Sequence, residues 1–451
     1  MVEPGRRLSL IPRIPAWKGC SGMSEDGKER VVELRYEGGA HTLPLLTGTE
    51  GDRAFEAKTL LSQAGMVTLD PGFANTAACQ SKITYIDGEA GILRYRGYPI
   101  QELASGSSFL EVAYLLIHGE LPGPGELKEF SEQLRANAAL PAEMRAMIDA
   151  LPRDGHPMIQ LGSAVNTMAA FYADTVDPGD SDQVDRATML LMAQLPTMAA
   201  RIYRNSVGEQ PLEPDRSLGY VEDFLRMTFG GDSGSRELDE LYAKAMDLLL
   251  ILHADHEQNC STATVRVVGS SQANLYGSVS AGINALFGPL HGGANQAVLE
   301  MLEEIRGLGG DVDSYLTKVK DKESSTRLMG FGHRVYKNFD PRSKEIKGLA
   351  AQILDRQEQP DQLFELALQL ENRALDDPYF TDRKLYPNVD FYSGVIYRAM
   401  GFPTSMFTVL FALGRLPGWI AHWREQRVDP AARIARPRQL YVGPEQRSYN
   451  D

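Results

Sequence analysis

Two stretches, GPLHGGAN at residues 288–295 and MGFGHRVYK at residues 329–337, decide how this chain is interpreted. They lie in a segment, residues 253–342, that holds four of the eight histidines. Each stretch sets one histidine, His291 or His333, beside glycines. Glycine lets a ligand approach the backbone closely, and imidazole exchanges protons near neutral pH. One such histidine would be an ordinary turn residue, but two in succession indicate a substrate site.

A third stretch, YPNVDFYSG at residues 386–394, carries a carboxylate among apolar and aromatic neighbours. Such surroundings desolvate Asp390 and would raise its pKa toward the range where a general base works. Taken alone, Asp390 is equally well a helix N-cap or a turn residue. The motif as a whole makes it the candidate base.

The stretch HADHE at residues 253–257 raises the question of a metal site. Zinc peptidase helices use H-E-x-x-H or H-x-x-E-H, and this order matches neither, so no metal site is predicted. The alternative places His256 near a helix C-terminus, where the dipole favours a cationic imidazole that binds a carboxylate. A structural role is expected for His253.

Composition sets limits on function. The chain has 451 residues, 43% apolar and 24% charged, which indicates a globular protein of two or more domains. A net charge of −14 argues against nucleic acid as a partner. Six arginines between residues 415 and 438 nevertheless suggest a local anion site, although Arg424 and Arg427 are expected on a solvated helix face. Arg415 and Phe411, four residues apart, would share one helix face.

The three cysteines give no disulfide framework and fit a reducing compartment. Cys260 is expected to be a small buried thiol. The sequence has no apolar run of membrane-spanning length, so no membrane contact is predicted, and a cytoplasmic location is preferred. Residues 1–22 weakly resemble a transit peptide, but their prolines and glycines interrupt any long amphipathic helix.

The pattern of apolar residues predicts a mainly α-helical fold. A hairpin is expected over residues 31–48, and further β structure over residues 67–96. Helical periodicity begins near Leu110, where Pro122 and Pro124 are expected to end the first helix. Further helices are predicted at 158–174, 186–204, 236–252, 296–305, 361–375 and 405–423.

These motifs together resemble citrate synthase, of the bacterial type with a β-rich N-terminal extension. The resemblance runs from about Leu43 to Tyr441. It implies a two-domain helical fold with a small β-rich N-terminal region. The expected parts are a disordered tail at 1–30, the β-rich region at 31–100, a large helical domain at 101–293 plus 405–451, and a small helical domain at 294–404.

The resemblance also implies a role for each site residue. His291, His333 and Asp390 would be catalytic, and Arg327 and Lys337 would bind CoA. No cofactor or metal is implied, and acetyl-CoA is the co-substrate. The residues expected to bind oxaloacetate are His256, Asn259, Arg342, Phe411, Arg415 and Arg436.

The implied reaction condenses acetyl-CoA with oxaloacetate to citrate and CoA, the first step of the tricarboxylic acid cycle. A homodimer would be the smallest active unit, because Arg436 would reach the neighbouring subunit's site, and a hexamer stays open. The alternative within the class is 2-methylcitrate synthase, which uses propionyl-CoA and shares these residues. Outside the class, the alternatives are a metal-dependent hydrolase built on His253 and His256 and a non-catalytic helical scaffold.

Overall fold

The computed structural model describes residues 30–230, 240–355 and 362–449. It is 57% helix and 7% strand, which confirms the predicted mainly α-helical class. The described residues form two compact units, one made of residues 82–428 and the other of residues 30–81 with 429–449. The predicted tail at 1–30 lies, apart from Arg30, outside the described residues. The predicted division into large and small helical domains stays a prediction.

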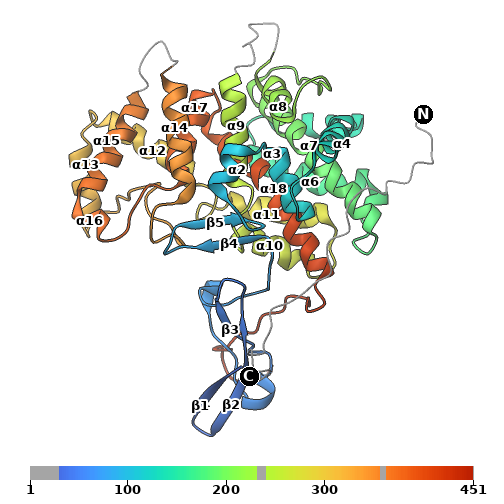
Figure 1. Ribbon diagram of the computed structural model, residues 1–451, viewed down its shortest axis with the longest axis vertical. Helices are drawn as coiled ribbons and strands as arrows, with labels where there is room; N and C mark the ends of the chain where they lie inside the picture. The colour runs from blue at the N-terminus through green and yellow to red at the C-terminus, as the bar shows by residue number, and fades with distance from the viewer. Residues whose placement is uncertain (1–29, 231–239, 356–361, 450–451) are drawn as a thin grey trace. The chain divides into compact units, whose positions relative to one another are not determined.

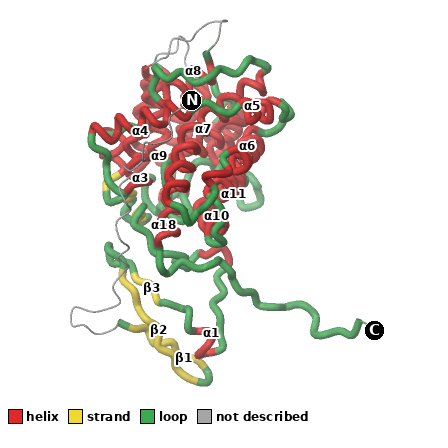
Figure 2. Tube along the Cα trace, turned by 90° about the vertical axis from the view of Figure 1, so that its right-hand side faces the viewer, coloured by secondary structure: helices red, strands yellow, loops and turns green. Residues whose placement is uncertain are grey.

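The second unit contains a three-stranded antiparallel sheet and a short helix, seen in yellow and red in Figure 2. β1 pairs with β2 from Val31 opposite Pro44 to Tyr36 opposite Gly39, which confirms the predicted hairpin. Gly38, at φ 108°, makes the turn that this pairing needs. The β structure expected over residues 67–96 is wrong for its first part, because residues 67–83 form no strand. The elements of this unit are β1 (Val31–Tyr36), β2 (Gly39–Thr47), β3 (Arg53–Phe55), α1 (Leu60–Ala64) and the 3-10 turn Pro71–Phe73.

The larger unit begins with a second small antiparallel sheet and continues as helices (Figure 1). At its first turn, Asp87 accepts hydrogen bonds from the N–H groups of Glu89 and Ala90, as expected of an Asp-Gly turn. The sheet consists of β4 (Thr84–Asp87), β5 (Ile92–Tyr95) and β6 (Tyr98–Pro99). The helices up to the first gap are α2 (Ile100–Gly106), α3 (Phe109–His118), α4 (Pro124–Asn137), α5 (Ala142–Asp149), α6 (Pro157–Phe171), α7 (Ser181–Val207) and α8 (Tyr220–Phe229). The remaining helices are α9 (Glu240–His253), α10 (Cys260–Gly269), α11 (Leu275–Phe287), α12 (Ala294–Gly307), α13 (Val312–Lys320), α14 (Pro341–Leu354), α15 (Gln362–Asp376), α16 (Pro378–Thr381), α17 (Val389–Ala399) and α18 (Phe407–Val428).

Helix α3 shows how local sequence sets these boundaries. Ser108 and Glu111 form a capping box at its start, and Gly119, at φ 98°, ends it. The prediction that Pro122 and Pro124 end this helix is therefore wrong. Pro124 instead occupies the first turn of α4, where its missing N–H costs nothing.

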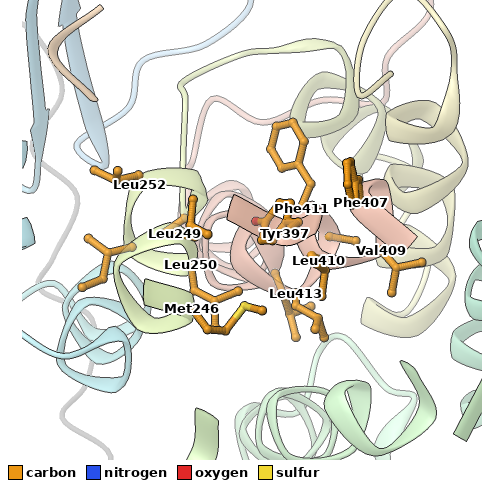
Figure 3. Close-up of a cluster of buried hydrophobic side chains, with 14 of the residues drawn as sticks. Met246, Leu249, Leu250, Leu252, Tyr397, Phe407, Val409, Leu410, Phe411 and Leu413 are labelled. Atoms are coloured by element: carbon orange, nitrogen blue, oxygen red, sulfur yellow. The ribbon is translucent and has the colours of Figure 1, made fainter. Parts of the chain in front are cut away.

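Helix α18 forms the centre of the larger unit, since its side chains from Phe407 to Glu425 are buried all round. Figure 3 shows Leu410, Phe411 and Leu413 of α18 beside Leu249 and Leu250 of α9. A helix that is apolar around its whole circumference belongs inside a protein. Helix α18 therefore lies in the core, where Arg415 contacts the segment that carries His253 and His256.

Burial of α18 overturns the expected exposure of Arg424, and the expected burial of Cys260 is also wrong. Arg424 is not on a solvated face: it is 7% exposed, and its Nη1 atom lies 2.6 Å from a carboxylate oxygen of Asp185. Arg427 is partly buried, with its guanidinium over the ring of Trp423. Cys260, expected to be buried, is exposed because it begins α10. No helix among the described residues is long and apolar enough to cross a membrane.

A close backbone contact at Gly418 gives a test of this packing. A Cβ atom added there would overlap the carbonyl oxygen of Ala254 and Oδ1 of Asp255, and a backbone oxygen cannot move cheaply. We expect Gly418→Ala to lower the free energy of unfolding by about 1–3 kcal/mol, the usual cost of overpacking. Urea denaturation measures this change.

The matched control is Gly348→Ala in the interior of α14. A Cβ atom there meets nothing within 4 Å. Alanine should stabilise this helix by about 0.5–1 kcal/mol, because glycine has the larger backbone entropy to lose. Equal effects of the two substitutions would contradict the close contact at Gly418.

Candidate active site

The larger unit brings the predicted motifs together from five parts of the chain. His256 follows α9, His291 lies in the turn between α11 and α12, and His333 lies in the loop between α13 and α14. Asp390 is the second residue of α17, and Arg415 lies on α18. The side chains of His256, His333 and Tyr336 form one cluster, described first.

His256 and His333 meet edge to face, with ring centroids 5.2 Å apart. Tyr336 touches both: its ring centroid is 4.8 Å from that of His333, and its hydroxyl lies 3.2 Å from Nε2 of His256. Burial raises the pKa of Tyr336 far above its usual value, so its hydroxyl stays protonated. Tyr336 was not predicted from the sequence, although it stands inside the quoted motif.

The backbone fixes the tautomer of His333. The N–H groups of Val335 and Tyr336 both donate to its Nδ1 atom, at 3.0 and 3.2 Å. Because an N–H can only donate, Nδ1 carries no proton and Nε2 carries one. Burial, reinforced by the charge of Arg342, lowers the pKa of His333 to about 4. His333 is therefore a neutral side chain that presents an Nε2–H donor.

His291 has the opposite tautomer to His333, and the segment at Ser261 fixes it. The N–H of Ser261 donates to its Nε2 atom at 3.2 Å, and the hydroxyl of Ser261 lies 3.0 Å from the same atom. Nε2 is therefore the acceptor, and Nδ1 carries the proton. Burial and then the charge of Arg415 lower the pKa of His291 to about 4. The site thus contains a second neutral donor.

Asn259 holds Ser261 in place. It is the N-cap of α10, and its Oδ1 atom accepts from the N–H of Thr262 at 3.1 Å and from the Ser261 hydroxyl at 2.8 Å. Its Nδ2 atom donates to the hydroxyl of Thr262 at 2.9 Å. Asn259 therefore orients the segment that supports His291.

Asp390 is held in the first turn of α17. Asn388 is the N-cap of this helix, so the N-cap interpretation of Asp390 is wrong. Asn388 also binds the glycine-rich turn: its Nδ2 atom donates to the carbonyl of Gly332 at 2.9 Å, and its N–H to that of Gly330 at 2.9 Å. Burial raises the pKa of Asp390 to about 6, which confirms the desolvation expected from its neighbours.

Two buried arginines face these groups. Arg342, 3% exposed, forms two parallel bonds with Asp340, of 3.0 Å from Nε and 2.9 Å from Nη2. Arg415, 1% exposed, donates from Nε to the carbonyl of His253 at 2.6 Å. The Nη1 atom of Arg415 is buried and has no hydrogen-bond partner among the described residues. Such an unsatisfied cation is a strong attraction for an anion.

Phe411 completes the wall around Arg415. The guanidinium carbon of Arg415 lies 4.9 Å from the ring centroid of Phe411. The ring centroids of His253 and His291 lie 4.6 and 6.5 Å from the same centroid. Burial lowers the pKa of Arg415 to about 10, which still leaves it charged at neutral pH. Phe411 and Arg415 share one face of α18, as their spacing predicted.

Comparison with known proteins decides the family. The model of the citrate synthase C-terminal domain matches residues 72–438. Citrate synthase 1 of Mycobacterium tuberculosis is 56% identical over 416 residues, covering 92% of this chain and 96% of that protein. The chain belongs to the citrate synthase family. Citrate synthase of Corynebacterium glutamicum is 54% identical over 415 residues, covering 92% of this chain and 95% of that protein.

A solved structure supports the same assignment. The citrate synthase of Thermoplasma acidophilum, in a ternary complex with carboxymethyl coenzyme A and oxaloacetate, has a TM-score of 0.77 and is 33% identical. The match covers 85% of this chain and 98% of that one. These names favour citrate synthase over the 2-methylcitrate alternative. The non-catalytic scaffold is thereby excluded.

The charge expected on His256 is wrong for the protein without ligand. Burial, followed by the charges of Arg342, His333 and Arg415, holds its pKa well below the ordinary value. The dipole of α9 does not outweigh this desolvation, since α9 ends at His253 and leaves His256 in a buried turn. His253 is also buried and neutral, with Nδ1 2.7 Å from the carbonyl of Leu249.

The three remaining predicted ligands are surface residues, and, in addition to burial, the charge of one of them, Lys337, lowers the pKa of His333. Arg327 and Lys337 are exposed, and Lys337 donates from Nζ to the carbonyl of Arg334 at 3.3 Å. Arg436 is exposed and belongs to the second unit. Among the described residues, no group of three or more His, Cys, Asp or Glu side chains is arranged to hold a metal ion.

Proposed function

We propose that this site joins the methyl carbon of acetyl-CoA to the ketone carbon of oxaloacetate, with Asp390 as the base and His291 and His333 as hydrogen-bond donors. One observation carries the proposal: two neutral histidines with opposite tautomers each lie near one of two buried arginines, and both arginines act on a carboxylate of raised pKa. Arg415 affects the pKa of both His291 and Asp390, and Arg342 affects the pKa of both His333 and Asp390.

Oxaloacetate binding follows from the arginines. The free Nη1 of Arg415 and the guanidinium of Arg342 supply charge for its two carboxylates. His256, whose pKa both arginines lower, and Asn259 are proposed as further ligands. Phe411 excludes water from the Arg415 side chain. Arg436 is proposed to add a third guanidinium, supplied by the neighbouring subunit.

Enolisation comes next. Asp390 removes a proton from the acetyl methyl group, and the electron pair moves toward the thioester oxygen. The Nδ1–H of His291 donates to that oxygen and stabilises the enolate. A neutral imidazole suits this task, because its remaining N–H is a very weak acid and offers a hydrogen bond without giving up the proton. A carboxylate pKa near 6 makes Asp390 a stronger base than an exposed aspartate and leaves it ionised at neutral pH.

Carbon–carbon bond formation completes the reaction. The enolate carbon attacks the ketone carbon of oxaloacetate, and the C=O electron pair moves onto the ketone oxygen. This oxygen accepts the hydrogen bond from Nε2–H of His333 and then takes that proton from the ring. The product is citryl-CoA, and water cleaves its thioester to citrate and CoA. Arg327 and Lys337 are proposed to bind CoA phosphates, since both are exposed cations near the His333 loop. No cofactor is required.

The pathway, the location and the oligomeric state of the enzyme are predictions. We place the enzyme at the entry to the tricarboxylic acid cycle, in the cytoplasm, with a homodimer as the smallest active unit. A hexamer built from such dimers stays open.

Replacing the base tests the reaction. We expect Asp390→Ala to lower CoA-thiol release from acetyl-CoA and oxaloacetate by about 10²–10⁴-fold, the usual contribution of a positioned general base. The wild type should prefer acetyl-CoA to propionyl-CoA. Asp382→Ala, an exposed aspartate eight residues away in sequence, is the control and should keep wild-type activity. Undiminished thiol release from Asp390→Ala would contradict the assignment.

Mixing two inactive variants tests the dimer. If Arg436 completes the partner's site, a mixed dimer of Arg436→Ala and Asp390→Ala contains one intact site. Random reassortment of the two variants should then restore about a quarter of wild-type activity. If Arg436 acts within its own chain, no mixed dimer has an intact site, and the mixture stays inactive.

A further inference from the structure

Asp340 is a buried carboxylate to which the proposed mechanism gives no task. It is 3% exposed and lies immediately before α14, of which it is the N-cap. Its Oδ1 atom accepts from the backbone N–H and from Nε of Arg342, both at 3.0 Å. Its Oδ2 atom accepts from Nη2 of Arg342 at 2.9 Å and from the backbone N–H of Val389 at 3.1 Å. One carboxylate thus accepts four hydrogen bonds.

These bonds join two functional groups that come from different helices. Val389 is the first residue of α17 and immediately precedes Asp390. Its N–H is one of the N-terminal donors that a helix cannot satisfy internally. Arg342 belongs to the first turn of α14, and its guanidinium carbon lies 5.9 Å from the ring centroid of Tyr336.

The geometry restrains both partners. Two parallel bonds to one carboxylate fix the plane of the Arg342 guanidinium, which a single bond would not do. The bond to Val389 fixes the start of α17 relative to that plane. Because the ion pair is buried, removing the carboxylate would leave a desolvated cation free to turn toward another partner.

We propose that Asp340 is a positioning residue, which holds the oxaloacetate-binding Arg342 and the helix turn that carries Asp390 in one fixed arrangement. This inference rests on the proposed function. It assigns to Asp340 no contact with substrate. Its effect passes through the two residues that it orients.

The charge of Asp340 supplies a second readout. Several groups face Asp390: Asp340 and Arg342 from α14, Arg415 from α18, and Tyr397 from α17. Burial is the first cause of the raised pKa of Asp390; Arg342 then lowers this pKa, Asp340 raises it, and Arg415 lowers it. Removing the negative charge therefore makes Asp390 easier to ionise. The acidic limb of the kcat/KM profile for acetyl-CoA should move to lower pH.

The experiment compares Asp340→Asn with Asp377→Asn by steady-state kinetics across pH. Asparagine keeps an oxygen that can cap α14 but loses the charge and the paired acceptors. Asp377 is a matched control, because it also precedes a proline, caps a helix, accepts from the N–H two residues later and pairs with a cation, Lys320. Asp340→Asn should lower kcat/KM for oxaloacetate by about 10- to 100-fold. It should also move the acidic limb of the acetyl-CoA profile to lower pH. Asp377→Asn should change neither.

A second variant separates position from charge. Asp340→Glu keeps the charge but displaces the carboxylate, so kcat/KM for oxaloacetate should fall while the acidic limb stays in place. Should Asp340→Asn fail to fold, as judged by circular dichroism, Asp340→Glu alone decides the proposal.

Three results would overturn the inference. Wild-type kcat/KM for oxaloacetate in Asp340→Asn or Asp340→Glu would remove the positioning role. An equal fall of kcat/KM for oxaloacetate in Asp377→Asn would show that the loss of any such helix cap has this effect. A fall in kcat/KM in Asp340→Asn with an unmoved acidic limb would also contradict it. Absence of thiol release from the wild type would instead overturn the proposed function and this inference with it.

Discussion

Desolvation of the site is the constraint on which the other properties depend. Arg415 is charged but almost wholly buried, and its Nη1 atom has no partner among the described residues. Burial is also the first cause of the low pKa of His291 and His333 and of the raised pKa of Asp390. Water around these groups would return each pKa toward its ordinary value. The same burial therefore makes the donors neutral, the base stronger and the anion site attractive.

Glycines make this burial possible by letting backbones approach. Gly330 has φ 76°, and a Cβ atom there would collide with Val298 and Phe391. The His333 turn can therefore lie directly against α17, to which Asn388 bonds it. The sequence suggested that these glycines serve ligand approach. The structure gives them a further task, which is to pack the turn against the helix that carries the base.

The sequence predicted the mainly helical class and the positions of several helices, because both depend on local patterns. Helical periodicity located α3, α12 and α18, and the aromatic neighbours of Asp390 indicated its raised pKa. Part of what failed depended on distant partners. Arg424 is buried because Asp185 on another helix meets it, and periodicity alone cannot show that.

Two residues of the site were not predicted, because their partners also lie on other elements. Tyr336 and Asp340 stand inside or beside the quoted motifs, so their position was visible, but their contacts with His256 and Val389 cross from one element to another. The charge of His256 was wrong because the sequence shows a helix end but not how deeply that end is buried.

Histidine titration in the protein without ligand tests the central claim most directly. Histidine-labelled protein would be followed by ¹⁵N NMR, with His291→Gln and His333→Gln used to assign the signals. The account predicts that both rings stay neutral down to pH about 4, with the proton on Nδ1 of His291 and on Nε2 of His333. Titration of either ring near pH 6.5, the ordinary value, would contradict it and show that the site is open to water.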